Sequence, residues 1–189
     1  QGHAYAVGAA IAAKFLAAHT GNPTFAKETI YAYISDGGVQ EEISQGAARI
    51  AGVLGLDNLV MFYDSNDIQL STETRVVMNE DTAAKYRALG WDVQEINGND
   101  AAQIRAAIEK AKAVKGKPAL IIGKCVMGKG ALKEDGSSYE RNCKTHGAPL
   151  GGDAYKNTIK NLGGDPENPF RIFDDVKELY AKRAAELET

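Results

Sequence analysis

The clearest indication of the fold is the segment Thr29-Ile30-Tyr31-Ala32-Tyr33-Ile34-Ser35-Asp36-Gly37-Gly38. Its first part is mostly β-branched or aromatic, which is typical of a β-strand, and Asp36-Gly37-Gly38 predicts a tight turn directly after it. After this turn the spacing of the apolar side chains changes from that of a strand to that of a helix. Apolar or small residues at helical spacing predict a helix over Gln40–Leu54. This order of strand, turn and helix is how a βαβ unit begins.

The alternation of strands and helices continues along the chain. Further strands are predicted over Asn58–Asp64, Trp91–Ile96 and Pro118–Cys125, and helices over His3–His19, Asp81–Leu89, Asn99–Val114, Asp153–Leu162 and Asp174–Leu187. Residues Val126–Gly152 are polar and rich in glycine, so we expect a long loop there. Alternating elements imply right-handed crossovers, and we therefore expect an α/β fold in which helices cover both faces of a parallel sheet.

Composition excludes several classes of protein. The 189 residues are 44% hydrophobic and 25% charged, which fits neither a disordered nor a membrane protein. A formal net charge of -3 gives no reason to expect nucleic acid or a membrane as a partner. No secretory signal pattern is present, so we expect a cytoplasmic protein. Because a helical pattern starts almost at once after Gln1-Gly2 without Met, we expect the chain to be part of a longer protein.

Polar residues follow the first two predicted strands, where ligands bind in open α/β sheets. Asp36 can supply a carboxylate oxygen, Asn66 an amide oxygen and Ile68 a backbone carbonyl, and together they could form one face of an octahedral cation site. A cation held by a single carboxylate keeps most of its charge, as clamping a diphosphate requires. Gly37 and Gly38 would let the backbone approach an anion at the N-terminus of the following helix.

Other interpretations of these residues are simpler. Asp-Gly after a strand is most often only a turn, and His146 alone would most often be a solvated loop residue. A calcium loop is excluded because Gln69 and Arg75 stand where an EF-hand needs Gly and Glu. The phosphate-binding motif of P-loop proteins and the dinucleotide motif are absent. Cys125, Cys143 and His146 lack a fourth ligand for a zinc site.

A larger set of motifs, in order along nearly the whole chain, resembles the transketolase family. The motifs are Gln1-Gly2, Asp36-Gly37-Gly38-Val39-Gln40-Glu41, Phe62–Ile68 with Asn66, Tyr86–Trp91, Asn97–Asp100 and His146–Leu150. The resemblance implies that residues 1–189 are part of a thiamine-diphosphate-binding domain whose companion domains lie outside this chain. It also implies reversible transfer of a two-carbon ketol group from a ketose phosphate to an aldose phosphate, in the pentose phosphate pathway, by a homodimer.

The resemblance also implies a role for individual residues. Mg²⁺ or Ca²⁺ would be bound by Asp36, Asn66 and the carbonyl of Ile68, and the cofactor by Gly37, Asn66, Leu70 and His146. His146 would be catalytic and assist proton transfer at the substrate's reacting oxygens, a task that suits histidine. Glu41 would neighbour the Glu of the other subunit that activates the cofactor. Thiamine diphosphate supplies the electron sink, and the protein holds it.

The chain departs from the family pattern at a few positions. Ser35 and Glu42 replace usual glycines, Gly38 replaces a commoner Cys, and the segment 134–145 is longer than expected. We therefore expect a slightly altered turn backbone at Ser35. Rival hypotheses are another thiamine-diphosphate enzyme, such as a deoxyxylulose-phosphate synthase or dihydroxyacetone synthase, an inert fragment, or a metal-and-nucleotide binder that uses Asp36 and Asn66.

Overall fold

The structure is a computed structural model that describes residues 1–188. It divides into two compact units. The first comprises Gln1–Met127 and Arg141–Gly147, and the second comprises Gly128–Glu140 and the chain from Ala148 onward. All the residues expected at the functional site belong to the first unit.

A parallel sheet of four strands forms the centre of the first unit. The strands are β1 (Ile30–Ser35), β2 (Leu59–Ser65), β3 (Asp92–Asn97) and β4 (Ala119–Lys124), in the order β1-β2-β4-β3. The four predicted strands and their parallel arrangement are confirmed, with ends that differ by at most one residue. Because all strands run the same way, the residues that follow β1 and β2 emerge at one edge of the sheet.

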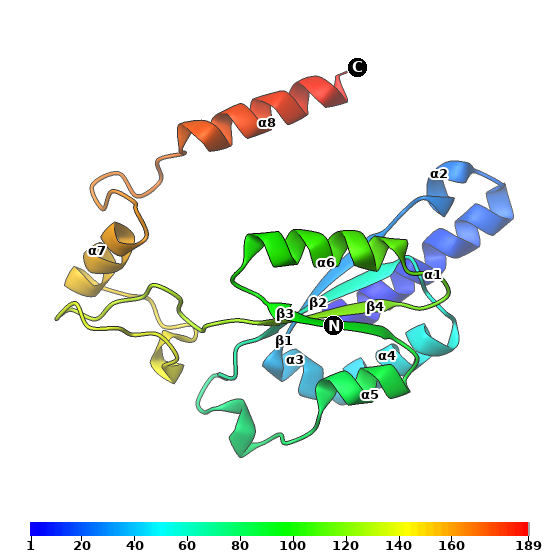
Figure 1. Cartoon of the computed structure of the whole chain (residues 1–189), viewed down its shortest axis with the longest axis horizontal. Coiled ribbons are helices and arrows are strands. Elements are labelled where there is room, and N and C mark those ends of the chain that lie inside the picture. Colours follow the sequence, from blue (N-terminus) through cyan, green and yellow to red (C-terminus); the bar gives the residue numbers. More distant parts are fainter. Residues whose placement is uncertain (189) are drawn as a thin grey trace. The chain divides into compact units, whose positions relative to one another are not determined.

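Helices cover both faces of the sheet, as predicted. The helices of the first unit are α1 (Gly2–Thr20), α2 (Pro23–Ala26), α3 (Asp36–Gln40), α4 (Glu42–Val53), α5 (Thr82–Ala88) and α6 (Ala101–Ala113), with short 3-10 turns at Thr74–Val76 and Cys143–Thr145. Figure 1 shows α6 on one side of the sheet and α3, α4 and α5 on the other. Helix α1 packs with this second group, because its buried residues share their core.

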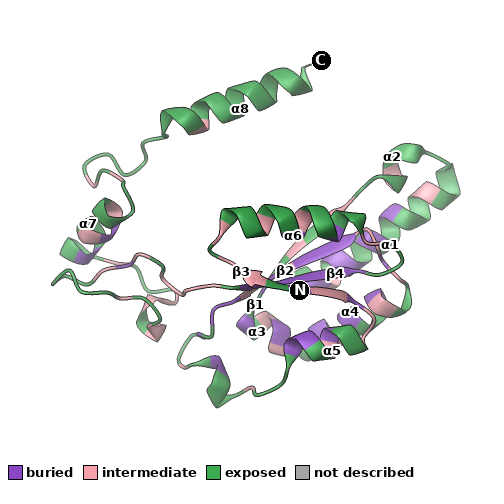
Figure 2. Cartoon of the chain, in the orientation of Figure 1, coloured by how far each residue is buried: buried purple, intermediate pink, exposed green. Residues whose placement is uncertain are grey.

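Side-chain alternation along the strands produces two cores. Met61 of β2 lies in the larger core with α1, α4 and α5, whereas its neighbour Val60 packs against Ala107 and Ala111 of α6. Successive side chains of a strand point to opposite faces, so a strand covered on both sides is apolar throughout. Figure 2 shows β2 and β4 largely buried, which explains why Asn58–Asp64 is almost entirely apolar in sequence.

The corner after β1 differs from the prediction. The expected turn at Asp36-Gly37-Gly38 is instead the first turn of α3, and the expected helix Gln40–Leu54 is interrupted at Glu41, whose ψ of 132° is extended. The Glu41 carbonyl then accepts the first hydrogen bond of α4, from the Ser44 N–H at 3.0 Å. A Cβ at Gly38 would lie 2.8 Å from Ile34 Cγ1, so this corner favours glycine because the helix turns back tightly against the strand.

Ser35 needs no special backbone. Its φ of -105° and ψ of 175° are extended, a conformation that any residue adopts, and it is the N-cap residue of α3. The altered turn expected from the replacement of glycine by Ser35 is therefore not found.

The second unit contains a hairpin and two helices. Within the expected loop Val126–Gly152, residues 131–139 form a hairpin with a bridge between Leu132 and Ser138, so this part is ordered by backbone pairing. Helix α7 (Gly152–Asn161) packs against it, since Thr158 Oγ1 accepts a hydrogen bond of 2.9 Å from the Leu132 N–H. Helix α8 (Asp174–Leu187) follows. Within residues 1–188 no helix is long and apolar enough to cross a bilayer.

Candidate functional site

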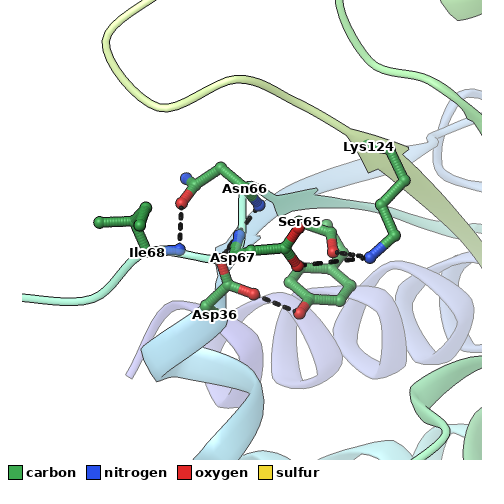
Figure 3. Close-up of polar contacts among 7 residues, drawn as sticks. Asp36, Ser65, Asn66, Asp67, Ile68 and Lys124 are labelled. Carbon is green, nitrogen blue, oxygen red and sulfur yellow. Dashed lines mark hydrogen bonds and ion pairs between the residues drawn. The ribbon is translucent and has the colours of Figure 1, made fainter. Parts of the chain in front are cut away.

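Asp36 is the centre of a polar cluster at the carboxyl edge of the sheet. Its side chain is buried, with the residue only 2% exposed, at the start of α3. One carboxylate oxygen accepts a hydrogen bond of 2.6 Å from the Tyr63 hydroxyl. The other accepts hydrogen bonds from the backbone N–H groups of Asn66 at 3.1 Å and Asp67 at 3.2 Å. Figure 3 shows Asp36 directed at the segment that follows β2.

The segment after β2 turns sharply around this carboxylate. Asp67 has a φ of 66°, in the left-handed region that few non-glycine residues adopt. The turn lets the Asn66 side-chain oxygen accept a hydrogen bond of 3.0 Å from the Ile68 N–H. Asn66 and Ile68 are both buried. Since β1 pairs with β2 through Ser35 and Asp64, the two segments leave neighbouring strands side by side. The structure thus brings together Asp36, Asn66 and Ile68.

Burial dominates the electrostatics of Asp36. Removal from water raises the pKa of its carboxyl above the ordinary value, while the hydrogen bonds from Tyr63 and from the Asn66 and Asp67 N–H groups act in the opposite direction. Among residues 1–188 no Lys, Arg or His side chain forms an ion pair with Asp36. A buried carboxylate that has only neutral donors is stabilised by a positive charge.

These residues fit a bound divalent cation. A carboxylate, an amide oxygen and a backbone carbonyl are hard oxygen ligands of the kind that Mg²⁺ and Ca²⁺ prefer. The Asn66 amide oxygen accepts one hydrogen bond and has a second lone pair for a ligand bond. In the described part of the chain no three His, Cys, Asp or Glu side chains gather as a metal site, so a cation here would depend on neutral oxygens.

Two partners of the cluster were not predicted from the sequence. Tyr63 donates to Asp36, and burial beside this carboxylate raises the pKa of the Tyr63 hydroxyl above its ordinary value, so that it remains a donor. Lys124 at the end of β4 donates to the Ser65 hydroxyl at 2.8 Å and lies 3.6 Å from a carboxylate oxygen of Asp67. The only sequence signal for either is a polar side chain at the carboxyl end of an apolar strand.

None of the remaining predicted site residues is among the hydrogen-bond partners of the Asp36 side chain within the described residues. Gly37 is exposed in the first turn of α3, and Glu41 is exposed at the break between α3 and α4. Leu70 is 74% exposed and lines a pocket of about 480 Å³ together with Cys143. His146 follows the turn Cys143–Thr145 and is half-buried, and its Nδ1 is buried without a hydrogen-bond partner among the described residues.

A pocket of about 290 Å³ opens beside the cluster. Asp36, Tyr63, Asp67 and Lys124 are among the residues that line it. The fold and this site define an α/β domain that can hold a cation and an anion at the carboxyl ends of its strands. A ligand that carries a diphosphate group matches both requirements.

Comparison with known proteins identifies the family. Residues 1–189 match the family model described as "Transketolase, thiamine diphosphate binding domain". The probable transketolase of Streptococcus pneumoniae is 41% identical over 191 residues, which cover 98% of this chain and 28% of that protein. Transketolase 2 of Xanthobacter flavus is 38% identical over 186 residues, which cover 97% of this chain and 26% of that protein.

Solved structures agree with this match. The transketolase from Leishmania mexicana is 35% identical and superposes with a TM-score of 0.88, covering 100% of this chain and 28% of that one. The transketolase from Campylobacter jejuni has a TM-score of 0.83 at 36% identity, covering 95% of this chain and 27% of that one. The chain belongs to the transketolase family and spans about a quarter of the length of the curated relatives it matches.

Proposed function

We propose that the full-length protein is a transketolase that transfers a two-carbon ketol group between sugar phosphates, with thiamine diphosphate as cofactor. Membership of the family supports this proposal. The observation that carries it is the buried Asp36 carboxylate, which has no basic partner among residues 1–188 and shares one edge of the sheet with Asn66 and Ile68. Residues 1–189 would be part of the diphosphate-binding domain.

The cation is proposed to be Mg²⁺ or Ca²⁺, held by Asp36, Asn66 and the carbonyl of Ile68. Its task is to bind the diphosphate of the cofactor, which Gly37 and Asn66 also contact. Gly37 is suited to this contact because a Cβ there would meet no atom within 4 Å, and α3 begins with its backbone N–H groups at this edge. When bound, thiamine diphosphate supplies the electron sink for breaking and forming the carbon–carbon bond.

Leu70 and His146 are proposed to complete the site on the side of the reacting ring. The exposed Leu70 side chain would lie against the thiazolium and shield it from water. His146 would bind the substrate's reacting oxygens and move a proton there. The Nδ1 atom of His146 is buried and has no hydrogen-bond partner among the described residues. It is therefore available to form a hydrogen bond with a ligand, which supports this role.

Glu41 is proposed to lie at the interface of a homodimer. Its exposure at the break between α3 and α4 leaves its carboxylate available to a second subunit, where it would neighbour the Glu that activates the cofactor. Because the resemblance puts this activating Glu in another domain, and the 189 residues span about a quarter of the relatives' length, we expect the isolated 189-residue chain to show no turnover. We further propose that the intact enzyme acts in the cytoplasm, in the pentose phosphate pathway.

The test uses the full-length protein and its Asp36→Asn variant. We expect the wild type with Mg²⁺ to bind thiamine diphosphate in calorimetry and to form sedoheptulose 7-phosphate from xylulose 5-phosphate and ribose 5-phosphate. Asp36→Asn should lose both properties, whereas Glu109→Gln, an exposed carboxylate on α6, should keep them. Absence of the sugar product with the wild type would reject the activity, and a different product would assign another thiamine-diphosphate reaction.

A further inference from the structure

A pocket of about 430 Å³ adjoins the proposed cation site. It is lined by Asn66, Asp67, Ile68, Glu73, Arg75 and Arg141. Two of these, Asn66 and Ile68, are the proposed cation ligands. Arg141 comes from a distant part of the sequence but belongs to the same compact unit. An arginine therefore shares a pocket with the residues that would hold a diphosphate-bound cation.

The charges that line this pocket are not all paired. Asp67 lies 3.6 Å from the Lys124 ammonium, and Glu73 forms an ion pair with Arg75. Arg141 is exposed and has no carboxylate partner anywhere in residues 1–188. Within the described chain, the Arg141 guanidinium is thus the only charged group of this pocket without an oppositely charged partner. An unpaired guanidinium beside a cation site favours an anionic ligand.

The backbone around Arg141 fixes its place. The Arg141 N–H donates a hydrogen bond of 2.9 Å to the Met127 carbonyl, which joins the two ends of the segment 128–140. Arg141 has a φ of 55°, a left-handed conformation that costs free energy in a non-glycine residue. The next residue, Asn142, caps the following turn by accepting from the Lys144 N–H at 2.9 Å.

Arg141 also lines the second pocket, the one that contains Leu70. That pocket is lined by Leu70, Ser71, Arg141, Asn142, Cys143 and Lys144. Arg141 is therefore common to the pocket of the proposed cation ligands and to the pocket where the proposed thiazolium contact lies. A ligand that extends from one pocket to the other would pass its guanidinium.

We propose that Arg141 binds a phosphate group of the enzyme's ligands through its guanidinium. This proposal rests on the proposed function, which supplies the phosphate ligands. The group is either the diphosphate of thiamine diphosphate or the phosphate of the sugar substrate, and both offer the oxygens that the planar guanidinium binds in pairs. Lysine keeps the charge but lacks this two-pronged geometry, so it should replace Arg141 only in part.

The experiment compares Arg141→Ala and Arg141→Lys with Lys117→Ala in the full-length protein. Lys117 is exposed just before β4, at the opposite edge of the sheet, so its loss removes the same charge far from the site. The readouts are the Kd of thiamine diphosphate, the Kd of inorganic pyrophosphate with Mg²⁺, and KM for xylulose 5-phosphate and for unphosphorylated hydroxypyruvate. Circular dichroism melts confirm folding, and Arg141→Gly, which relieves the left-handed backbone, serves as a second charge-free variant.

We expect Arg141→Ala and Arg141→Gly to weaken phosphate binding about 10- to 100-fold, which is typical for loss of a hydrogen bond to a charged group. Arg141→Lys should fall between them and the wild type, and Lys117→Ala should match the wild type. Weaker binding of thiamine diphosphate and pyrophosphate assigns the cofactor's diphosphate. A KM that rises for xylulose 5-phosphate alone assigns the sugar phosphate.

Unchanged values for all ligands in Arg141→Ala and Arg141→Gly, within twofold of the wild type, would overturn the proposal while leaving the proposed function intact. A wild type that binds pyrophosphate in an Arg141-dependent way, but not thiamine diphosphate, would reject the proposed function and keep the phosphate site. A wild type that binds none of the phosphate ligands would overturn both.

Discussion

The burial of His3 predicts that the first unit loses stability in mild acid. The side chain of His3 is 4% exposed in the larger core, with its ring centroid 6.4 Å from that of Tyr86 and 6.0 Å from that of Trp91. Neither ring nitrogen has a hydrogen-bond partner within residues 1–188. Burial, assisted by the charge of the N-terminus, lowers the pKa of His3 from 6.5 to about 4.

The sign and size of the effect follow from linkage. From about pH 7.5 upward His3 is almost entirely neutral in both the folded and the unfolded chain, so it adds almost no pH dependence there. As the pH falls through 6.5, His3 takes up a proton in the unfolded chain but stays neutral in the folded chain, so the free energy of unfolding falls. The loss from His3 is about 2 kcal/mol by pH 5 and about 3 kcal/mol once the pH is below 4.

Urea denaturation of the 189-residue chain, followed by the fluorescence of Trp91, its single tryptophan, measures this loss directly. The wild type should lose about 2 kcal/mol more between pH 7.5 and pH 5 than His3→Leu, which has no titrating group at this position. His19→Leu, at an exposed position of the same helix, should follow the wild type. Equal pH dependence of the wild type and His3→Leu would instead show that His3 accepts its proton in the folded state and that its burial does not lower its pKa.

Further predictions concern packing, the site and the metal. Gly52→Ala should cost about 3 kcal/mol in urea denaturation, since its Cβ would lie 1.7 Å from the Leu89 carbonyl oxygen, whereas Gly46→Ala on the same helix, with no atom within 4 Å, should gain about 0.5–1 kcal/mol. Equal effects would contradict the close approach of α4 and α5. Tyr63→Phe should lower the free energy of unfolding by about 2 kcal/mol in the same assay, because it removes a hydrogen-bond donor to the buried Asp36. An unchanged denaturation midpoint would show that this hydrogen bond does not stabilise the fold. In the full-length protein, EDTA should abolish thiamine diphosphate binding in calorimetry and Mg²⁺ should restore it; binding that persists in EDTA would exclude the metal's role.

The strands could be predicted because their signals are local, whereas the sheet order could not. The apolar run Leu59–Ser65 identifies a strand buried on both faces by composition alone. The position of β4 between β2 and β3 depends on tertiary packing instead. A Cβ at Gly98 would lie 2.9 Å from the Gly123 backbone, so the loop after β3 approaches β4 closely. No local sequence pattern predicts such a contact.

The same distinction applies to the site. Asp36 and Asn66 were predictable because each follows its own strand, and parallel pairing brings such ends together. The contacts of Tyr63 and Lys124 were not, since they depend on register. Lys124 meets the Ser65 hydroxyl because β2 and β4 pair at these two residues, and a shift of one position would direct it to the other face.

The break at Glu41 is a third case. Residues 40–54 carry one continuous helical pattern, yet the chain forms α3 and α4 with an extended residue between them. The spacing of apolar residues shows only which face of a helix is buried. Because α3 and α4 both bury apolar residues in the same core, the apolar pattern continues past Glu41 and does not indicate the break.

A crystal structure of the full-length protein with thiamine diphosphate and Mg²⁺ would show whether Asp36, Asn66 and Ile68 bind the cation. We expect a cation with oxygen ligands from Asp36, Asn66 and the Ile68 carbonyl at about 2.0–2.1 Å, bound also to the diphosphate. A cation and diphosphate located elsewhere, with Asp36 still bonded only to Tyr63 and the backbone N–H groups, would contradict this expectation.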